Sequence, residues 1–462
     1  MKEPTVSQMK RVLLIAYYFP PDFAVGGQRI AKFARNLPTF GWEPTVLTIA
    51  DRYREQLDKE RVNDLGNTRV IKTVKVPKFT DLLMVIKRTV AVIFKNKKSE
   101  NRSVFVDGKA GNSGNVQAET LMQKIKRYYI SFSFFPDYER SWVIPAALKA
   151  MFEIKRRQHD CIITSSPPHS SHIIGLIIKK LINVGWVADF RDPWMDILPY
   201  RAPYIRSTLS DRIESWIEGQ VVRNANRILT TTNEHRIKLM GRFPSEAVDK
   251  FVYVSNGIDI KKFQTESLPE RYATFTISYA GTIYLNRSPE PLFKAIQKLI
   301  NAKKIEISTI NFKLFGVFES IEGKTVFELA RDYGIESIVE ISAPIPLNEA
   351  IHVMKRSHLL LLLVTPIQSI NIPAKIYDYF GSRTKILAIT EPGATAELIN
   401  TTNTGACFIP CDIDGIAEYI YSQCQNKNRD HVRNDPKQYT QFDTEVLTEK
   451  LSMTLSQLQT PM

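Results

Sequence analysis

Cysteine is scarce in this sequence, and its spacing forms no metal or disulfide pattern. Only four cysteines occur in 462 residues, at positions 161, 407, 411 and 424, and none lies in a Cys-x-x-Cys pair. Structural zinc sites use such pairs, and small secreted proteins use dense disulfide frameworks. The sequence therefore argues against both, and it predicts a reducing compartment.

Long apolar runs are also missing. The longest are Val12–Phe19 and Leu359–Val364, which have the length of strands, whereas a membrane-spanning helix needs about 20 apolar residues. Val12–Phe19 leads directly into Pro20-Pro21 without a small-residue cleavage site, so it does not resemble a secretory signal. We therefore expect a cytoplasmic protein.

Acidic residues are outnumbered by basic ones. The chain has 48 acidic against 62 basic residues, which gives a net charge of +14. Such an excess predicts an acidic partner, which leaves nucleic acid, anionic lipid or a phosphorylated substrate. Because no helix-turn-helix, RNA-recognition or zinc-finger pattern is present, we expect no nucleic-acid partner.

Short apolar strands alternate with helical patterns through both halves of the chain. In the first half we expect strands at 12–16, 44–48, 69–73, 160–164, 186–189 and 227–231, and helices at 30–37 and 171–181. In the second half we expect strands at 276–280, 311–315, 338–341, 359–364 and 386–389, and helices at 289–301, 323–333, 347–355, 375–380 and 394–399. This alternation predicts an α/β protein with two doubly wound, mostly parallel sheets that face a cleft.

A basic segment at about 77–129 interrupts the alternation. Its cations include Lys95, Lys97 and Lys98, its acids are few, and apolar residues such as Leu82 and Ile86 lie between them. Basic amphipathic helices of this composition lie on anionic bilayers. We expect contact with an anionic membrane surface here, although an ordinary solvated helical insertion has the same pattern.

The segment 372–387, IPAKIYDYFGSRTKIL, carries the most informative charges of the chain. We expect a short helix from Ala374 to Phe380, with Lys375 and Asp378 on one face, that stops at Gly381-Ser382. Free amides at its N-terminus would bind phosphate oxygens, and Asp378 would accept from ribose hydroxyls. The pattern suits a nucleoside diphosphate, and equally a surface helix with an ion pair.

A second glycine-containing turn follows the first strand. Gly26 and Gly27 open a helix, and adjacent glycines allow close backbone approach to an anion. The turn is neither a dinucleotide fingerprint nor a phosphate-binding P-loop. Its place directly after the first strand, at the edge of the sheet that faces the cleft, makes it a candidate binding turn.

Seven segments together resemble glycosyltransferase family 4, of the exopolysaccharide and O-antigen type. They occur in the family's order and cover nearly the whole chain apart from the basic insertion: RVLLIAYYFPPDFAVGGQRIAKFARNLPTFGWEPTVLT, ITSSPPHSSH, WVADFRDPW, ANRILTTTNEHR, VYVSNGID, YAGTIYLNRSP and IPAKIYDYFGSRTKILAI. The resemblance implies the GT-B fold, with two Rossmann-like domains at 1–262 and 268–434 and a hinge near 259–270. It also implies a C-terminal helix, within 435–462, that crosses back to the first domain.

The resemblance assigns donor-site roles in the second domain. Arg287, after Gly281 and Thr282, matches a cation that neutralises the donor diphosphate, and Lys375 is expected to be the second such cation. Asp378 matches the later acid of a Glu-x7-Glu motif, which holds the ribose. The earlier position is occupied by Ile370, so Asn371, Gln368 or Ser369 is expected to hold the donor sugar instead.

The resemblance also assigns residues in the first domain. Gly26 and Gly27 match the loop that approaches donor and acceptor, and Arg191, in the sequence Asp189-Phe190-Arg191-Asp192, stands where many members have a histidine near the anomeric carbon. We take Arg191 and Asp189 as catalytic candidates, with a structural ion-pair network as the alternative. His169 and His172 are weaker candidates.

The expected activity is that of a retaining, metal-independent hexosyltransferase that uses a nucleotide sugar as substrate and no cofactor. Metal independence is expected because cations can stabilise the leaving diphosphate directly. The expected acceptor is a glycan or a polyprenyl-linked glycan of a cell-surface polysaccharide, handled in the cytoplasm or at the inner face of the cell membrane. A nucleotide-sugar epimerase and a non-catalytic assembly partner are the alternatives.

Overall fold

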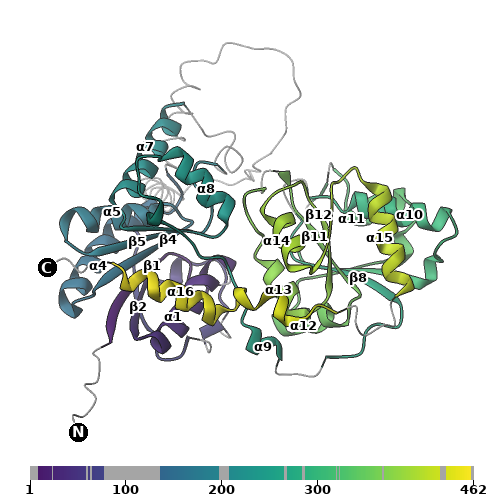
Figure 1. Cartoon of the computed structure of the whole chain (residues 1–462), viewed down its shortest axis with the longest axis horizontal. Helices are drawn as coiled ribbons and strands as arrows, with labels where there is room; N and C mark the ends of the chain where they lie inside the picture. The colour runs from purple at the N-terminus through teal and green to yellow at the C-terminus, as the bar shows by residue number, and fades with distance from the viewer. Residues whose placement is uncertain are drawn as a thin grey trace, which may run out of the picture.

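The computed structural model describes the chain except for residues 1–8, 23, 59–60, 63–64, 77–135, 197–207, 265–267, 284–286, 319, 322, 367–368, 427–432 and 459–462. Two parallel sheets, one from each half of the chain, form two α/β domains (Figure 1). The basic segment predicted at 77–129 lies outside the described residues.

The first sheet has seven strands in the order β3-β2-β1-β4-β5-β6-β7. The strands are β1 (Lys10–Ala16), β2 (Trp42–Ile49), β3 (Arg69–Thr73), β4 (Cys161–Ser166), β5 (Gly185–Phe190), β6 (Arg227–Thr230) and β7 (Phe251–Tyr253). All neighbouring strands are parallel. The central strands are buried on both faces, which explains why they appear in the sequence as continuous apolar runs.

Helices cover both faces of the first sheet. One face packs against α1 (Gln28–Asn36) and the C-terminal α16 (Thr444–Ser456), which contributes Leu447, Leu451 and Leu455 to the core. The other face packs against α4 (Val143–Arg157), α5 (Ser170–Leu181) and α7 (Thr208–Asn224). A further helix, α8 (Asn233–Arg242), joins β6 to β7.

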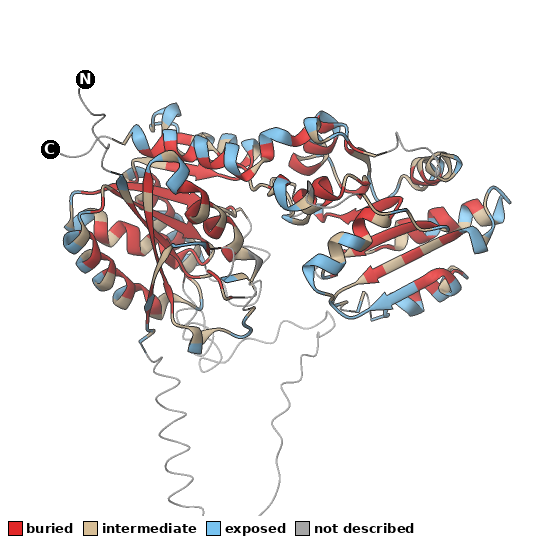
Figure 2. Ribbon diagram, turned by 90° about the horizontal axis from the view of Figure 1, so that it is seen from below, coloured by how far each residue is buried: buried red, intermediate tan, exposed pale blue. Residues whose placement is uncertain are grey.

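The second sheet has six parallel strands in the order β10-β9-β8-β11-β12-β13. They are β8 (Phe275–Ala280), β9 (Ile310–Phe315), β10 (Val339–Ser342), β11 (Leu359–Leu363), β12 (Lys385–Ile389) and β13 (Gly405–Phe408). The helices are α10 (Glu290–Asn301), α11 (Val326–Asp332), α12 (Leu347–Arg356), α13 (Lys375–Ser382), α14 (Ala394–Thr402) and α15 (Ile413–Gln425). Buried residues follow most of both sheets, and exposed residues lie mainly on the outer sides of the helices, in loops and on the edge strand β10 (Figure 2).

The chain crosses between the domains twice, and the two crossings pair with each other. The outward crossing contains Ile258 and α9 (Ile260–Gln264), and the return crossing contains the 3-10 helix Pro436–Phe442 that leads into α16. Ile258 donates its amide to Phe442 O and accepts from the amide of Thr444, at 2.9 and 2.8 Å. Both crossings pack on α13, where Phe380 stacks on Tyr439. This arrangement confirms the predicted return of a C-terminal helix to the first domain.

Each strand and helix with a predicted range is present, with boundaries that differ by a few residues, whereas no range was predicted for α4, α7, α8, α9 or α15. Three further differences concern two strands and one helix end. Two strands were not predicted, β7 and β13, both of which are short and only partly buried. The helix predicted to stop at Gly381-Ser382 instead includes both residues, and Arg383, with a φ of 60°, is its C-cap. Gly381 is used for packing, since a Cβ there would lie 2.5 Å from atoms of Ile258 and Phe263.

Candidate functional site

Lys375 and Gly281 meet at the carboxyl edge of the second sheet. Gly281 follows β8, and Lys375 is the first residue of α13. A Cβ on Gly281 would lie 2.6 Å from the Nζ of Lys375, and the φ of Gly281 is 136°, which favours glycine. The same Nζ lies 3.9 Å from the centroid of the Tyr279 ring. Two residues that are almost 100 positions apart in the sequence therefore form one site.

Lys375 interacts with the charges of two neighbouring residues, Arg287 and Asp378. Burial and the nearby positive charge of Arg287 lower the pKa of Lys375 to about 7, whereas the carboxylate of Asp378 opposes this change. Arg287 is itself buried, with 6% of its surface exposed. Two cations held close together in a desolvated site repel each other, and a bound anion would relieve that repulsion. We call Arg287 and Lys375 the cation pair.

Asp378 connects α13 to the first domain. Burial raises its pKa, and the charges of Lys32 on α1 and of Lys375 lower it. Lys32 donates to the carbonyl of Gly257 at 2.7 Å, which places its Nζ at the junction of the domains. The Asp378 carboxylate is therefore close enough to Lys32 of the first domain to interact with its charge.

The loop before α13 is held from both domains. Thr232, the N-cap of α8 in the first domain, donates its hydroxyl to Ile370 O at 2.6 Å. On the other side, Thr395 of α14 donates to Asn371 O at 3.1 Å. The Oδ1 of Asn371 is buried and accepts no hydrogen bond from any described residue. Gln368, another candidate for this role, lies outside the described residues.

The expected free amides at the start of α13 are already used in part. The amides of Ile376 and Tyr377 donate to Pro373 O and Ala374 O, at 3.1 and 3.2 Å. The prediction that these amides are available to phosphate is therefore wrong for Ile376 and Tyr377, because the helix begins with tight i to i−3 bonds.

In the first domain, Asp189 pairs with Arg29 and not with Arg191. The guanidinium of Arg29 donates from Nε and Nη2 to the Asp189 carboxylate at 3.1–3.2 Å, and Ser165 donates to it at 2.9 Å. The remaining donors of Arg29 reach Val254 O at 2.7 Å and Ser255 O at 2.5 Å. Asp189 has no exposed surface. The predicted ion-pair network exists, but its arginine comes from α1.

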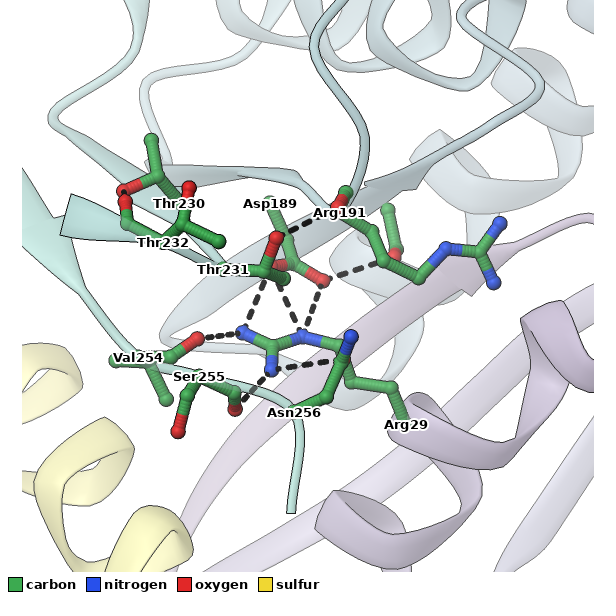
Figure 3. Close-up of polar contacts among 10 residues, drawn as sticks. Arg29, Asp189, Arg191, Thr230, Thr231, Thr232, Val254, Ser255 and Asn256 are labelled. Carbon is green, nitrogen blue, oxygen red and sulfur yellow. Dashed lines mark hydrogen bonds and ion pairs between the residues drawn. The ribbon is translucent and has the colours of Figure 1, made fainter. Parts of the chain in front are cut away.

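Arg191 points away from this network, as Figure 3 shows. Its Nη2 lies 3.4 Å from Pro167 O, and its backbone carbonyl accepts from Thr231 at 2.8 Å. A Cβ on Gly26 would overlap the guanidinium of Arg191, so this arginine can occupy its position only because residue 26 has no side chain. The structure thus brings Gly26 and Arg191 together and leaves Asp189 in a separate, buried position.

Gly27 has a packing role of its own. A Cβ there would lie 2.9 Å from the Cα of Phe19, so α1 can begin this close to Phe19 only because residue 27 is glycine. Thr282, the neighbour of Gly281, is exposed, and its carbonyl accepts from the Tyr279 hydroxyl at 2.9 Å. The recorded contacts of Gly27 and of Thr282 do not include Arg287 or Lys375.

The two candidate histidines are core residues. His172 has no exposed surface, its Nδ1 lies 2.8 Å from the Thr164 hydroxyl, and burial lowers its pKa to about 3. His169 is 3% exposed and stacks on Trp194, with 4.7 Å between ring centroids. Their burial favours the structural interpretation.

Sequence analysis missed several polar residues at the domain junction. Arg29, Lys32 and Thr232 were not singled out, and neither were Glu234 and Glu397, which line a hollow of about 380 Å³ beside Gly393. Burial and the neighbouring Glu397 raise the pKa of Glu234. Their partners lie far away in the chain, so no local spacing marks them. The one available signal was their position in the chain. Each of these residues lies on or next to a helix that follows a parallel strand, and such helices begin at the sheet edge that faces the other domain.

Among the described residues, no helix has both the length and the apolar character that crossing a bilayer requires. Within the same residues, no three or more histidine, cysteine or acidic side chains gather where a metal ion would fit. Independence from metal remains a prediction.

No protein-family model and no curated protein matches the chain. Solved structures do match over nearly its whole length. A glycosyltransferase from Rickettsia africae is 12% identical, with a TM-score of 0.61 and 98% of this chain and 100% of that chain covered. The lipopolysaccharide outer core galactosyltransferase WaaB is 12% identical, with a TM-score of 0.56 and coverage of 96% and 99%. WaaG, a glycosyltransferase involved in lipopolysaccharide biosynthesis, is 12% identical, with a TM-score of 0.53 and coverage of 96% and 100%. These likenesses and the two parallel sheets establish that this chain has the two-domain α/β architecture of the GT-B fold.

Proposed function

We propose that the chain is a retaining glycosyltransferase of family 4 that moves a sugar from a nucleotide sugar to a glycan or lipid-linked glycan. The setting is the assembly of a cell-surface polysaccharide of the exopolysaccharide or O-antigen type. The observation that carries the proposal is the contact of Lys375 with Gly281, beside Arg287, at the carboxyl edge of the second sheet. In doubly wound sheets, ligands bind outside this edge.

The cation pair suits the departure of a nucleoside diphosphate. In the reaction, the bond from the anomeric carbon to the β-phosphate oxygen breaks, and a bond to an acceptor hydroxyl oxygen forms on the same face. The acceptor's proton passes to the leaving phosphate. Negative charge therefore grows on the diphosphate, where Arg287 and Lys375 stabilise it without moving. An anion beside Lys375 raises its pKa from about 7, so the side chain is a full cation when the charge develops.

Other residues take positioning roles. Asp378 accepts hydrogen bonds from the ribose, since its carboxylate is close enough to Lys32 of the first domain to interact with its charge. Asn371 offers its buried Oδ1 to the donor sugar in place of the acid that Ile370 replaces. Arg191, which Gly26 admits, approaches the anomeric centre from the first domain. Asp189 acts through Arg29, because it holds α1 against the Val254 and Ser255 carbonyls.

The acceptor side of the proposal places the protein in the cytoplasm, in contact with the inner face of the cell membrane. The net charge of +14 supports attraction to anionic lipid. The basic segment 77–129 is the part of the sequence expected to make that contact. The protein would then bind a lipid-linked acceptor at the membrane surface in which that acceptor is anchored.

The test is a transfer assay with UDP-, GDP-, dTDP- and ADP-sugars and a polyprenyl-diphosphate-linked acceptor, followed by NMR of the product anomer. We expect transfer from one donor in the presence of EDTA, with retention of configuration. Arg287→Ala should lower kcat by about 10²–10³. A sugar epimer formed without acceptor would identify an epimerase. Failure of every nucleotide to bind, seen as an unchanged melting temperature, would indicate an assembly partner.

A further inference from the structure

Three helices form one continuous outer surface of the first domain. α4 packs beside α5, and α5 packs beside α7, so the three cover the sheet face opposite α1 and α16 (Figure 1). We call the exposed residues of these helices the outer helical face. The helices use their inner sides for the core, and no described element packs on the outer sides of these residues.

The outer helical face is rich in large apolar side chains. On α4, Ile144, Leu148 and Phe152 are 56%, 61% and 55% exposed and follow one another at intervals of four residues. On α7, Leu209, Ile213 and Trp216 form a similar stripe, with Trp216 60% exposed. Residues four apart lie on the same side of a helix. Two parallel apolar stripes therefore point outward, where a soluble helix would normally carry polar residues.

All charges on the outer helical face have the same sign. Its exposed cations are Lys155, Arg156, Lys180, Arg212 and Arg223. None of its exposed residues is acidic. The acids of these helices are buried or half-buried: Glu153 pairs with Arg69, Glu214 accepts from Trp194, Glu218 pairs with Arg242, and Asp211 is half-buried. A surface of apolar and basic residues without an exposed carboxylate is complementary to an apolar layer behind negative headgroups.

We propose that the outer helical face docks on an anionic lipid bilayer. Basic residues reach the phosphate layer, and the apolar stripes, with Trp216, enter the boundary between headgroups and acyl chains. The inference rests on the membrane contact of the proposed function and assigns it to a defined surface whose residues are other than 77–129. Its test measures lipid contact alone, so its failure is distinguishable from failure of sugar transfer.

Trp216 supplies a direct reporter of docking. The chain has five tryptophans, all of them in the described part; Trp142, Trp186 and Trp194 have no exposed surface, and Trp42 is 2% exposed. Exposed tryptophan fluorescence therefore comes from Trp216. Vesicles that contain one third phosphatidylglycerol and lipids brominated on the acyl chain should quench this fluorescence, shift it to shorter wavelength and protect it from acrylamide. Trp216→Phe should lose these changes and still sediment with the vesicles.

Charge variants with a matched control complete the test. Replacement of Lys155, Arg156 and Arg212 by glutamine should lower vesicle partitioning roughly a hundredfold at low salt, because each basic residue near an anionic surface contributes about a fivefold gain. The control replaces Lys303, Lys304 and Arg331, exposed cations of the second domain, and removes the same charge. It should change partitioning less than threefold.

Three results would overturn the proposal. The first is no sedimentation with anionic vesicles at low salt. The second is sedimentation without quenching of Trp216, which would assign binding to another surface. The third is protection of Trp216 without lipid, together with a dimer in analytical ultracentrifugation, which would make the face a protein interface.

Discussion

The ammonium group of Lys375 lies 3.9 Å from the centre of the Tyr279 ring and makes no hydrogen bond to any described residue. A buried ammonium normally has carboxylate or carbonyl partners. Here its neighbours are an aromatic face, a glycine and the charges of Arg287 and Asp378, and the Asp378 carboxylate acts only through its charge, without a hydrogen bond. Such a lysine is poorly satisfied without a ligand, and an anion would supply the missing interactions.

Replacing Lys375 by methionine should stabilise the ligand-free protein at low pH. The native pKa, about 7, is below the ordinary value of 10.5, so the unfolded chain binds more protons between these values. Burial of the charged ammonium therefore lowers the free energy of unfolding by its full amount below pH 7, and this loss disappears as the pH rises toward 10.5. We expect Lys375→Met to gain about 1–2 kcal/mol at pH 6, since a tenfold change in proton affinity corresponds to about 1.4 kcal/mol and the lost ring contact offsets part of it.

Urea denaturation of both proteins at pH 6, 8 and 9.5 measures this gain. Lys304→Met serves as the control, because Lys304 is exposed and also lies over a tyrosine ring, that of Tyr421. Its effect should be small and the same at each pH. A Lys375→Met variant that is less stable than the parent at pH 6 would show that the ammonium is well satisfied in the native state.

Asp189→Asn should be strongly destabilising, because it leaves the buried guanidinium of Arg29 without its counter-charge. Asp189 is fully buried and Arg29 is 6% exposed. Removal of one partner of a buried ion pair costs about 3–5 kcal/mol. Asp249→Asn, in a pair with Arg227 whose acid is 73% exposed, should cost less than about 1 kcal/mol. Equal losses of unfolding free energy in the two variants would refute the structural role given to Asp189.

Gly27→Ala should destabilise the first domain by about 1–3 kcal/mol, because the new Cβ would lie 2.9 Å from the backbone of Phe19. Gly241→Ala, in α8, is the matched control. A Cβ there meets nothing within 4 Å, so alanine should stabilise the helix by up to about 1 kcal/mol. Thermal unfolding of the two variants gives the comparison. An unchanged melting temperature for Gly27→Ala would mean that the turn is not packed as described.

The fold was largely predictable from the sequence because buried parallel strands are continuous apolar runs. Leu359–Leu363 and Val12–Ala16 lie in the centre of their sheets, and both were predicted. Phe251–Tyr253 and Gly405–Phe408 lie at sheet edges, where partial exposure weakens the pattern, and both were missed. Exposure weakens the pattern but does not abolish it, since the partly exposed edge strands Arg69–Thr73 and Val339–Ser342 were predicted.

The site was predictable only where a local pattern marked it. Lys375 and Asp378 were found because they share a helix face, and Arg287 because its segment resembles a known family. Arg29 was missed because its partners are the carbonyls of Val254 and Ser255 and a carboxylate 160 residues away. Backbone carbonyls carry no sequence signal, so only the folded chain identifies which arginine Asp189 binds.

The central claim is that Arg287 and Lys375 bind the diphosphate of a nucleotide. The most direct measurement is isothermal titration of UDP, GDP, dTDP and ADP into the parent, Arg287→Ala and the control Arg331→Ala. We predict that one diphosphate binds the parent and the control with equal affinity and binds Arg287→Ala at least about tenfold more weakly, as the loss of a charge-assisted contact requires. Equal affinity of that diphosphate for the parent and Arg287→Ala would contradict the claim.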